Sequence, residues 1–141
     1  MEGEPPAEAL TYLLDTHVLI RWLQDDRRLT RAQRRAIRRA SEERPLWVSD
    51  ISLWEIATLH VVGRIALRLP LREWLDRATA PPLVRRCGIS PAVATEVASL
   101  PRAFPRDPAD RIIVATARVL GATLLTSDGG IVESELVPTL S

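Results

Sequence analysis

Four acidic residues in this chain are placed where a folded domain would bring them together. Asp15, Glu55, Asp110 and Asp128 stand at the ends of apolar runs or near the starts of predicted helices, and they are spread over most of the sequence. Carboxylates gathered without basic partners repel one another and raise their own proton affinity. A fold that gathers them normally does so to hold a hard cation such as Mg²⁺ or Mn²⁺. A metal bound in this way, and still open to water and phosphate, can hydrolyse phosphodiesters.

Each acid, taken alone, also has a purely structural explanation. Asp15 is suited to cap the helix that follows it, and Glu55 completes a Ser-x-x-Glu capping box. Asp107 and Asp110 stand at a helix start, where negative charge is favoured by about 0.3–1 kcal/mol. Asp128 precedes two glycines and suits a turn. The functional interpretation rests on the set, because four independent caps need not lie on one rim of a sheet. We assign Asp107 to the cap and Asp110 to the metal.

Apolar runs alternate with helical patterns along the chain. Strands are predicted at 10–14, 45–49, 83–89 and 122–126, with a short edge candidate at 136–140. Helices are predicted between them, after Thr16 as far as Leu23, from Thr30 to about 40, and at 50–62, 71–79, 92–100 and 111–120. This order predicts an α/β fold, a three-layer α/β/α sandwich with a central parallel sheet. In such sheets ligands bind outside the carboxyl ends of the strands, where Asp15 and Asp128 fall.

Two of the predicted helices carry further expectations. The helix over 50–62 is predicted to be amphipathic, with Trp54 among its apolar residues. Thr16 is expected to cap the first helix. The helix after Thr30 is rich in arginine and is interpreted mainly as a solvated face.

Length and composition predict one domain in an intracellular protein. A chain of 141 residues with 46% hydrophobic content fits a single domain at 10–141, preceded by a flexible tail at 1–9. The net charge is +1 and all 19 residues of Lys and Arg type are arginine, which coding bias explains better than RNA binding does. Cys87 is the only cysteine, which excludes an internal disulfide. The sequence shows neither a membrane-length apolar stretch nor a secretory pattern, so we expect a cytoplasmic location.

Several other enzyme classes lack their motifs. The sequence contains no Gly-x-Ser-x-Gly elbow, no phosphate-binding glycine loop and no His-Glu-x-x-His pair. His17 stands near the predicted acidic rim, although a partly buried helix histidine is the commoner fate. His60 lies toward the far end of its helix from Glu55. The four tryptophans could stack on bases, yet most of them occupy apolar positions that suit a core.

Four sequence motifs span the chain from about Leu10 to Asp128. The motifs are Leu13-Leu14-Asp15-Thr16-His17, Val48-Ser49-Asp50-Ile51-Ser52-Leu53-Trp54-Glu55-Ile56-Ala57, Asp107-Pro108-Ala109-Asp110-Arg111-Ile112-Ile113-Val114-Ala115-Thr116-Ala117 and Leu125-Thr126-Ser127-Asp128. Together they resemble the motifs of the PIN-domain ribonucleases, and more narrowly those of the VapC-type toxins of type II toxin–antitoxin pairs, and they occur in the family's order.

This resemblance implies a PIN-like α/β/α sandwich and Mg²⁺- or Mn²⁺-dependent endoribonuclease activity. The family's acidic quartet, which is both catalytic and metal-binding, corresponds to Asp15, Glu55, Asp110 and Asp128. Family members are commonly homodimers. They are neutralised by a small antitoxin, which often brings an arginine toward the carboxylates. The chain departs from the pattern after Asp128, where glycine replaces a frequent basic residue.

Two alternatives to an RNA-cleaving toxin stay open from the sequence. One is a structure-specific DNA nuclease, and the other is a catalytically silent module that binds an antitoxin. Under the leading hypothesis Arg111, and part of the arginine-rich helix, would contact RNA phosphates. Replacing Asp15 by Asn would then abolish cleavage while leaving the metal-free fold intact or more stable.

Overall fold

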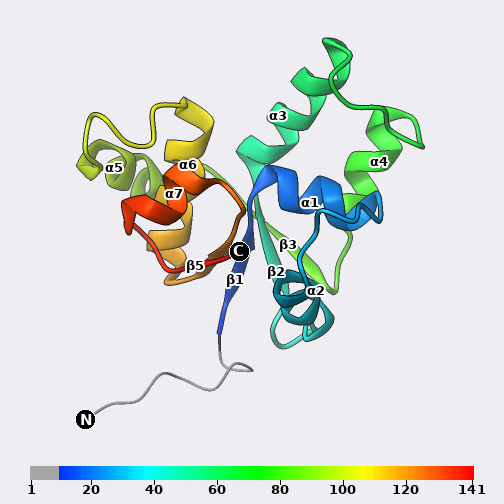
Figure 1. Ribbon diagram of the computed structural model, residues 1–141, viewed down its shortest axis with the longest axis horizontal. Coiled ribbons are helices and arrows are strands. Elements are labelled where there is room, and N and C mark those ends of the chain that lie inside the picture. The colour runs from blue at the N-terminus through cyan, green and yellow to red at the C-terminus, as the bar shows by residue number, and fades with distance from the viewer. Residues whose placement is uncertain (1–9) are drawn as a thin grey trace.

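A five-stranded parallel sheet lies at the centre of the structure, with strand order β3-β2-β1-β4-β5 (Figure 1). The computed structural model describes residues 10–141. The strands are β1 (Tyr12–Leu14), β2 (Leu46–Ser49), β3 (Val84–Cys87), β4 (Thr123–Leu125) and β5 (Thr139–Leu140). The helices are α1 (Thr16–Leu23), α2 (Arg31–Arg38), α3 (Asp50–Val61), α4 (Leu71–Ala78), α5 (Pro91–Ser99), α6 (Pro108–Leu120) and α7 (Gly129–Ser134). The predicted α/β/α sandwich is confirmed.

Local signals in the sequence set most helix ends. The Thr30 side chain accepts from the Gln33 N–H, and the two residues form a reciprocal capping box. Asp107 caps α6 ahead of Pro108. Gly121 ends α6 with a φ of 62°, a left-handed conformation that glycine adopts without strain. One predicted cap was wrong, because Asp15 rather than Thr16 caps α1.

The alternation of side chains along the strands divides the interior into two apolar layers. Tyr12 and Leu14 of β1 pack with α1, α2 and α4 on one face of the sheet. Leu13, between them, packs with α5 and α6 on the other face. Successive side chains of a strand point to opposite faces, so a sheet covered on both sides needs apolar residues at consecutive positions. This requirement explains the uninterrupted apolar run of β1.

Helices α3 and α4 extend beyond the carboxyl edge of the sheet, at the upper right of Figure 1. Ile56 of α3 is fully buried, whereas Trp54 is 60% exposed and Val61 79% exposed. The expectation of an amphipathic helix with Trp54 on its buried side was therefore wrong. Only one flank of α3 meets the body of the protein, and apolar residues also occupy the flank that faces solvent.

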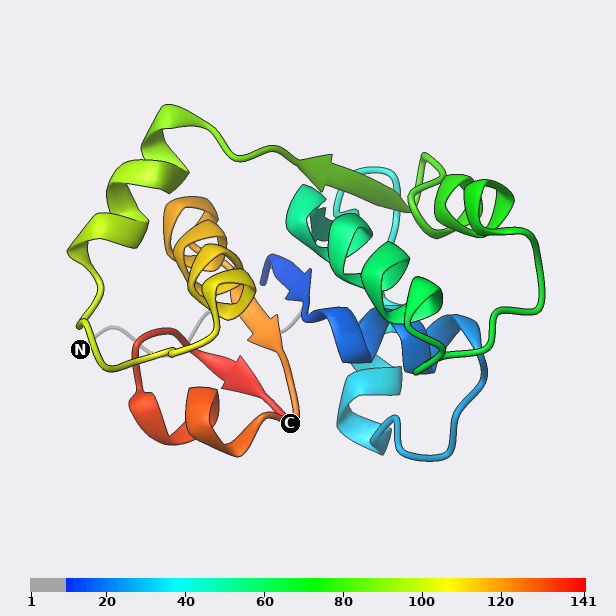
Figure 2. The same ribbon diagram turned by 90° about the horizontal axis from the view of Figure 1, so that it is seen from above.

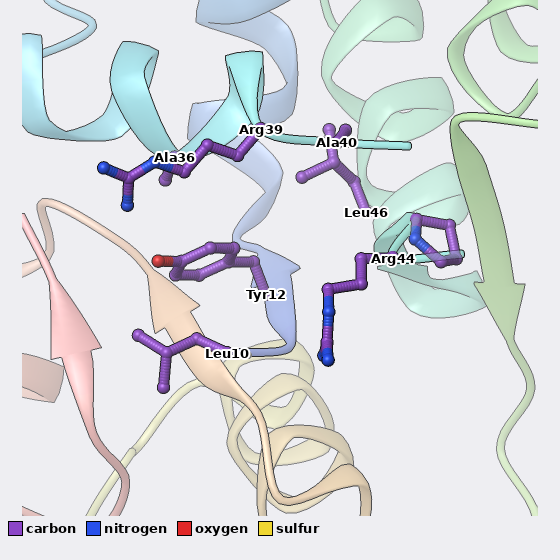
Figure 3. Close-up of a pocket in the computed structure, with 8 residues that line it drawn as sticks. Leu10, Tyr12, Ala36, Arg39, Ala40, Arg44 and Leu46 are labelled. Carbon is purple, nitrogen blue, oxygen red and sulfur yellow. The ribbon is translucent and has the colours of Figure 1, made fainter. Parts of the chain in front are cut away.

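The amino ends of β1 and β2 border a small pocket, which Figure 3 shows between Tyr12, Ala36 and Leu46. Its volume is about 10 Å³, roughly enough for one water molecule. No acidic side chain lines it, so this pocket is not the place where the four acids meet.

No helix within residues 10–141 is long and apolar enough to cross a membrane. The predicted tail at 1–9 lies outside the described residues, and the division into a tail and one domain stays a prediction.

Candidate active site

The parallel register places Asp15 at the carboxyl edge of the sheet, beside the end of β4. Leu14 pairs with Leu125, and the Asp15 N–H donates to the Leu125 carbonyl at 3.0 Å. The Asp15 side chain is 3% exposed. Its Oδ1 accepts from the Thr16 N–H at 2.8 Å, and its Oδ2 accepts from the Thr126 hydroxyl at 2.7 Å. These donors hold the carboxylate in one orientation at the base of the site.

This geometry changes one expectation for Asp15. An Asn amide in its place would turn one acceptor into an N–H₂ group facing the Thr126 hydroxyl, so the proton of that hydroxyl would lose the acceptor that Oδ2 of Asp15 provides. A buried hydrogen-bond partner left unmatched costs about 1–3 kcal/mol. The Asp15→Asn variant is therefore expected to lose stability, contrary to the expectation from sequence.

Glu55 reaches the same region from α3. Its Oε1 accepts from the Thr16 hydroxyl at 2.5 Å, and the Ser52 hydroxyl is the other partner of Thr16, at 2.8 Å. Burial raises the pKa of Glu55, and the charges of Asp15 and Asp107 add to the rise, against the lowering effect of the Thr16 hydrogen bond. The capping-box explanation for Glu55 is wrong, because Ser49 caps this helix and Glu55 lies well inside it.

Asp110 lies in the first turn of α6, where Asp107 occupies the cap position, as the sequence predicts. The Asp107 carboxylate accepts from the N–H groups of Ala109 and Asp110 at 2.8 and 3.2 Å. Burial is the largest cause that raises the pKa of Asp110 to about 7. The charges that raise it further belong, in decreasing order of effect, to Asp15, Asp107, Asp128 and Glu55. Four carboxylates from four separate elements therefore act on one side chain.

Asp128 follows β4 and caps α7, a short helix that the sequence patterns did not predict. Its Oδ1 accepts from the Ile131 N–H at 3.1 Å. Its own N–H donates to the Thr126 hydroxyl, which in turn donates to Asp15. The turn explanation for Asp128 was thus half right: the residue shapes the chain locally, and it also lies near enough to Asp110 to raise its pKa.

The family comparison agrees with this arrangement of acids. The sequence profile of the PIN domain matches residues 12–133. The chain belongs to the PIN-domain family. It is also 43% identical over 118 residues to Ribonuclease VapC22 of Mycobacterium tuberculosis (strain ATCC 25618 / H37Rv), covering 84% of this chain and 87% of the relative. That identity places this PIN domain in the VapC group.

Solved structures support the fold assignment of the PIN domain. One neighbour is VapBC2 from Rickettsia felis bound to a promoter DNA fragment, with a TM-score of 0.69, 14% identity, and coverage of 93% of this chain and 98% of that one. Another is VapBC-1 from nontypeable Haemophilus influenzae, with a TM-score of 0.66, 15% identity, and coverage of 94% and 98%. At these identities the likeness concerns the fold alone.

The acidic side chains of this PIN domain are of the chemical type that binds a hard divalent cation, because they offer carboxylate oxygens. Within residues 10–141, none of Glu55, Asp110 and Asp128 forms an ion pair with an arginine. The raised pKa of Asp110 is the expected sign of a cluster that lacks a counter-charge. In the described part of the chain, however, no group of three or more His, Cys, Asp or Glu side chains already has the geometry to hold an ion. The acids lie near one another, but their side chains do not form a complete coordination shell.

A groove adjoins the acids of the PIN domain between α3 and α6, the two helices that flank the centre of Figure 2. Its volume is about 260 Å³, and Trp54, Glu55 and Asp107 are among its lining residues. Trp54 was expected in the core, yet its exposed ring borders the acidic centre. The structure thus leaves it available to a ligand.

Arg111 does not have the role expected from sequence. Its guanidinium donates to the carbonyls of Pro101, Phe104, Pro105 and Val97 at 2.8–3.3 Å. These bonds fasten the end of α5 and the following loop to α6. Because its donors are engaged by the backbone, Arg111 supports the position of Asp110 rather than offering a free contact to phosphate.

Two threonines belong to the site although the sequence analysis did not assign them to it. Thr16 orients Glu55, and Thr126 joins Asp15 to the Asp128 backbone. Both are buried, and in the sequence motifs Thr16 follows Asp15 directly whereas Thr126 is two residues before Asp128. That nearness in sequence was the available signal, because a buried hydroxyl near a carboxylate usually finds a partner there.

Proposed function

We propose that this chain is an endoribonuclease that hydrolyses RNA phosphodiesters with Mg²⁺ or Mn²⁺ held by Asp15, Glu55, Asp110 and Asp128. The observation that carries the proposal is the environment of Asp110. Its pKa rises to about 7 because it is partly buried and because the charges of four other carboxylates add to the rise. Such a centre is electrostatically unfavourable when all the acids are ionised, and a divalent cation removes the cause.

The acids contribute differently to the proposed site. When bound, the cation supplies an activated water and offsets charge on the phosphate. Asp15 is the rigid ligand, since hydrogen bonds fix both of its oxygens. Asp110 must lose its proton to bind the ion. Glu55, oriented by Thr16 and with a raised pKa, is placed to orient the attacking water and accept a proton.

The groove beside the acids suits a single-stranded nucleic acid. Glu55 and Trp54 both line it, so a strand in the groove with a phosphate near Glu55 would pass the exposed Trp54 ring. An indole face can stack on any base. Family membership supports RNA as the substrate, because the relative at 43% identity is a ribonuclease.

The proposed biological role is that of the toxin in a toxin–antitoxin pair. The structural neighbours include VapBC complexes, which contain the antitoxin with the toxin. We propose a small antitoxin protein as the partner of this chain, a homodimer as its assembled state and the cytoplasm as its location. Co-expression with the neighbouring short reading frame should give a stable complex in which RNA cleavage is suppressed.

The decisive experiment measures cleavage of single-stranded RNA by the purified protein with Mg²⁺, with Mn²⁺ and with a chelator. We expect cleavage only with the metals. The variant Asp110→Asn should lose at least about 100-fold in rate, since even residues outside the first metal shell contribute about 10–100-fold. This variant keeps the size of the side chain and removes only its charge.

Asp76→Asn provides the matched control. Asp76 is an exposed acid on α4 that pairs with Arg72 at 3.1 Å and does not contact the acidic centre. Its replacement should leave cleavage unchanged. Equal activity of the Asp110→Asn and Asp76→Asn variants would contradict the site assignment. Cleavage of branched DNA in preference to RNA would instead favour the DNA nuclease.

A further inference from the structure

His17 joins two segments of the acidic centre that lie far apart in the sequence. Its Nδ1 lies 3.3 Å from Oδ2 of Asp15, at the end of β1. Its Nε2 accepts from the Ser127 N–H at 2.9 Å, in the segment that leads from β4 to Asp128. One imidazole therefore spans the space between the first and the last of the four acids.

These contacts define the tautomer of the ring. An amide N–H can donate only to an unprotonated nitrogen, so Nε2 carries the lone pair. The ring proton is then on Nδ1, which lies 3.3 Å from Oδ2 of Asp15. Because the lone pair of Nε2 accepts from the Ser127 N–H, His17 has no free lone pair for a metal ion or for action as a general base.

The segment that His17 holds has other hydrogen bonds besides the one to the imidazole, including the Asp128 cap of α7. Ser127 and Asp128 are exposed. The Asp128 N–H has its own link to Asp15 through the Thr126 hydroxyl. The Ser127 hydroxyl accepts from the Gln33 side chain at 3.1 Å. Of these contacts, only the imidazole joins the Ser127 backbone directly to the Asp15 carboxylate.

We propose that His17 is a positioning residue that fixes the Ser127–Asp128 segment relative to Asp15, and so sets how the two carboxylates share a divalent cation. The inference rests on the proposed metal-dependent function, which it deepens. Outer partners that orient metal ligands are commonly worth about 10–100-fold in metal affinity. His17 acts through two ligands at once.

The first test needs no metal and no activity. Nitrogen-15 NMR of the metal-free protein at pH 8 should show His17 with a protonated Nδ1 and an unprotonated Nε2, with exposed His60 as the internal reference. Hydrogen exchange of the Ser127 amide should be at least about 10-fold faster in His17→Phe, which keeps the bulk of the ring without its nitrogens. It should slow again in His17→Gln, which keeps an acceptor near the position of Nε2. A protonated Nε2, or equal exchange in all variants, overturns the inference.

The second test measures Mn²⁺ affinity by calorimetry. His17→Phe should bind Mn²⁺ about 10–100-fold more weakly than the wild type, His17→Gln should recover part of the loss, and His60→Ala should match the wild type. Wild-type affinity in His17→Phe would show that the ring serves packing alone and would overturn the proposal. A wild-type protein that binds no Mn²⁺ would instead refute the proposed function, while the NMR and exchange measurements still decide the role of His17.

Discussion

At the scale of single residues, the pKa of Asp110 shows most clearly how the neighbouring carboxylates act on one another. Partial burial and the neighbouring carboxylates raise the pKa of its carboxyl group from an ordinary 3.8 to about 7. A group whose pKa is raised by folding binds more protons in the native state, so its contribution to stability is lost as the pH rises between those two values. Glu55 acts in the same direction, because its pKa is also raised by burial.

This linkage predicts a pH-dependent gain in stability for Asp110→Asn. In metal-free buffer the variant should melt at a higher temperature than the wild type, and the difference should grow between pH 5 and pH 8. Thermal unfolding with a chelator present measures it. Addition of Mn²⁺ at pH 8 should raise the melting temperature of the wild type more than that of the variant. A difference that stays constant with pH would contradict the assignment of Asp110.

Thr126 gives a second prediction at this scale. Its buried hydroxyl donates to Asp15 and accepts from the Asp128 N–H. Replacement by valine keeps the shape and removes both bonds, so the free energy of unfolding should fall by about 1–3 kcal/mol. Urea unfolding measures the loss. Thr95→Val is the control, because Thr95 is exposed and bonds only the Pro91 carbonyl of its own helix; its cost should stay within about 0.5 kcal/mol.

At the scale of elements, the start of α6 depends on a loop held from within the helix. Arg111 donates to five carbonyls at the end of α5 and in the following loop. A planar guanidinium can serve several acceptors at once, which a lysine ammonium on a flexible stem cannot do in the same geometry. The neighbouring Asp110 is thereby kept at its place on the rim.

Replacing Arg111 by alanine or by lysine should therefore destabilise the fold by about 1.5–3 kcal/mol, the range for hydrogen bonds to charged groups. Limited proteolysis should show earlier cleavage within 100–106. RNA binding measured against salt concentration distinguishes this role from a phosphate contact. Loss of a contact would lower the slope by about one unit, whereas we expect no change in slope.

At the scale of the whole molecule, the sheet separates two apolar layers that share the same strands. Leu13 faces one layer and Leu14 the other, and both are fully buried. The layers cannot unfold independently without exposing the common sheet. The carboxyl edge of that sheet is where the acids meet, so its integrity also sets the geometry of the site.

Leu13→Ala and Leu14→Ala should each destabilise the protein by about 2–5 kcal/mol, although the two side chains pack on opposite faces. Unfolding should stay a single transition. Urea titrations followed by far-UV circular dichroism and by tryptophan fluorescence should coincide, with Trp74 reporting on one layer and Trp47 on the other. Separate transitions in the two signals would show that the layers fold independently.

The sequence by itself determined the features that arise from local interactions. The apolar runs predicted the sheet, and caps such as Thr30, Asp107 and Gly121 predicted helix ends, because these residues act within a few positions of the backbone they stabilise. The four acids were identified from sequence motifs and from their positions after apolar runs or near predicted helix starts. Helix α7 was not predicted, because six residues are too few to show a helical repeat of apolar residues.

Only the tertiary structure decided how those residues face one another. The raised pKa of Asp110 and the bridge through His17 require atoms from segments far apart in the chain. The loop that Arg111 holds is near it in sequence, but only the folded loop brings its carbonyls to the guanidinium. Trp54 is exposed because no element within residues 10–141 covers that flank of α3. Sequence spacing predicts which nearby residues a side chain can contact. Its burial, and the effect of distant charges on its pKa, depend on which segments the fold packs around it.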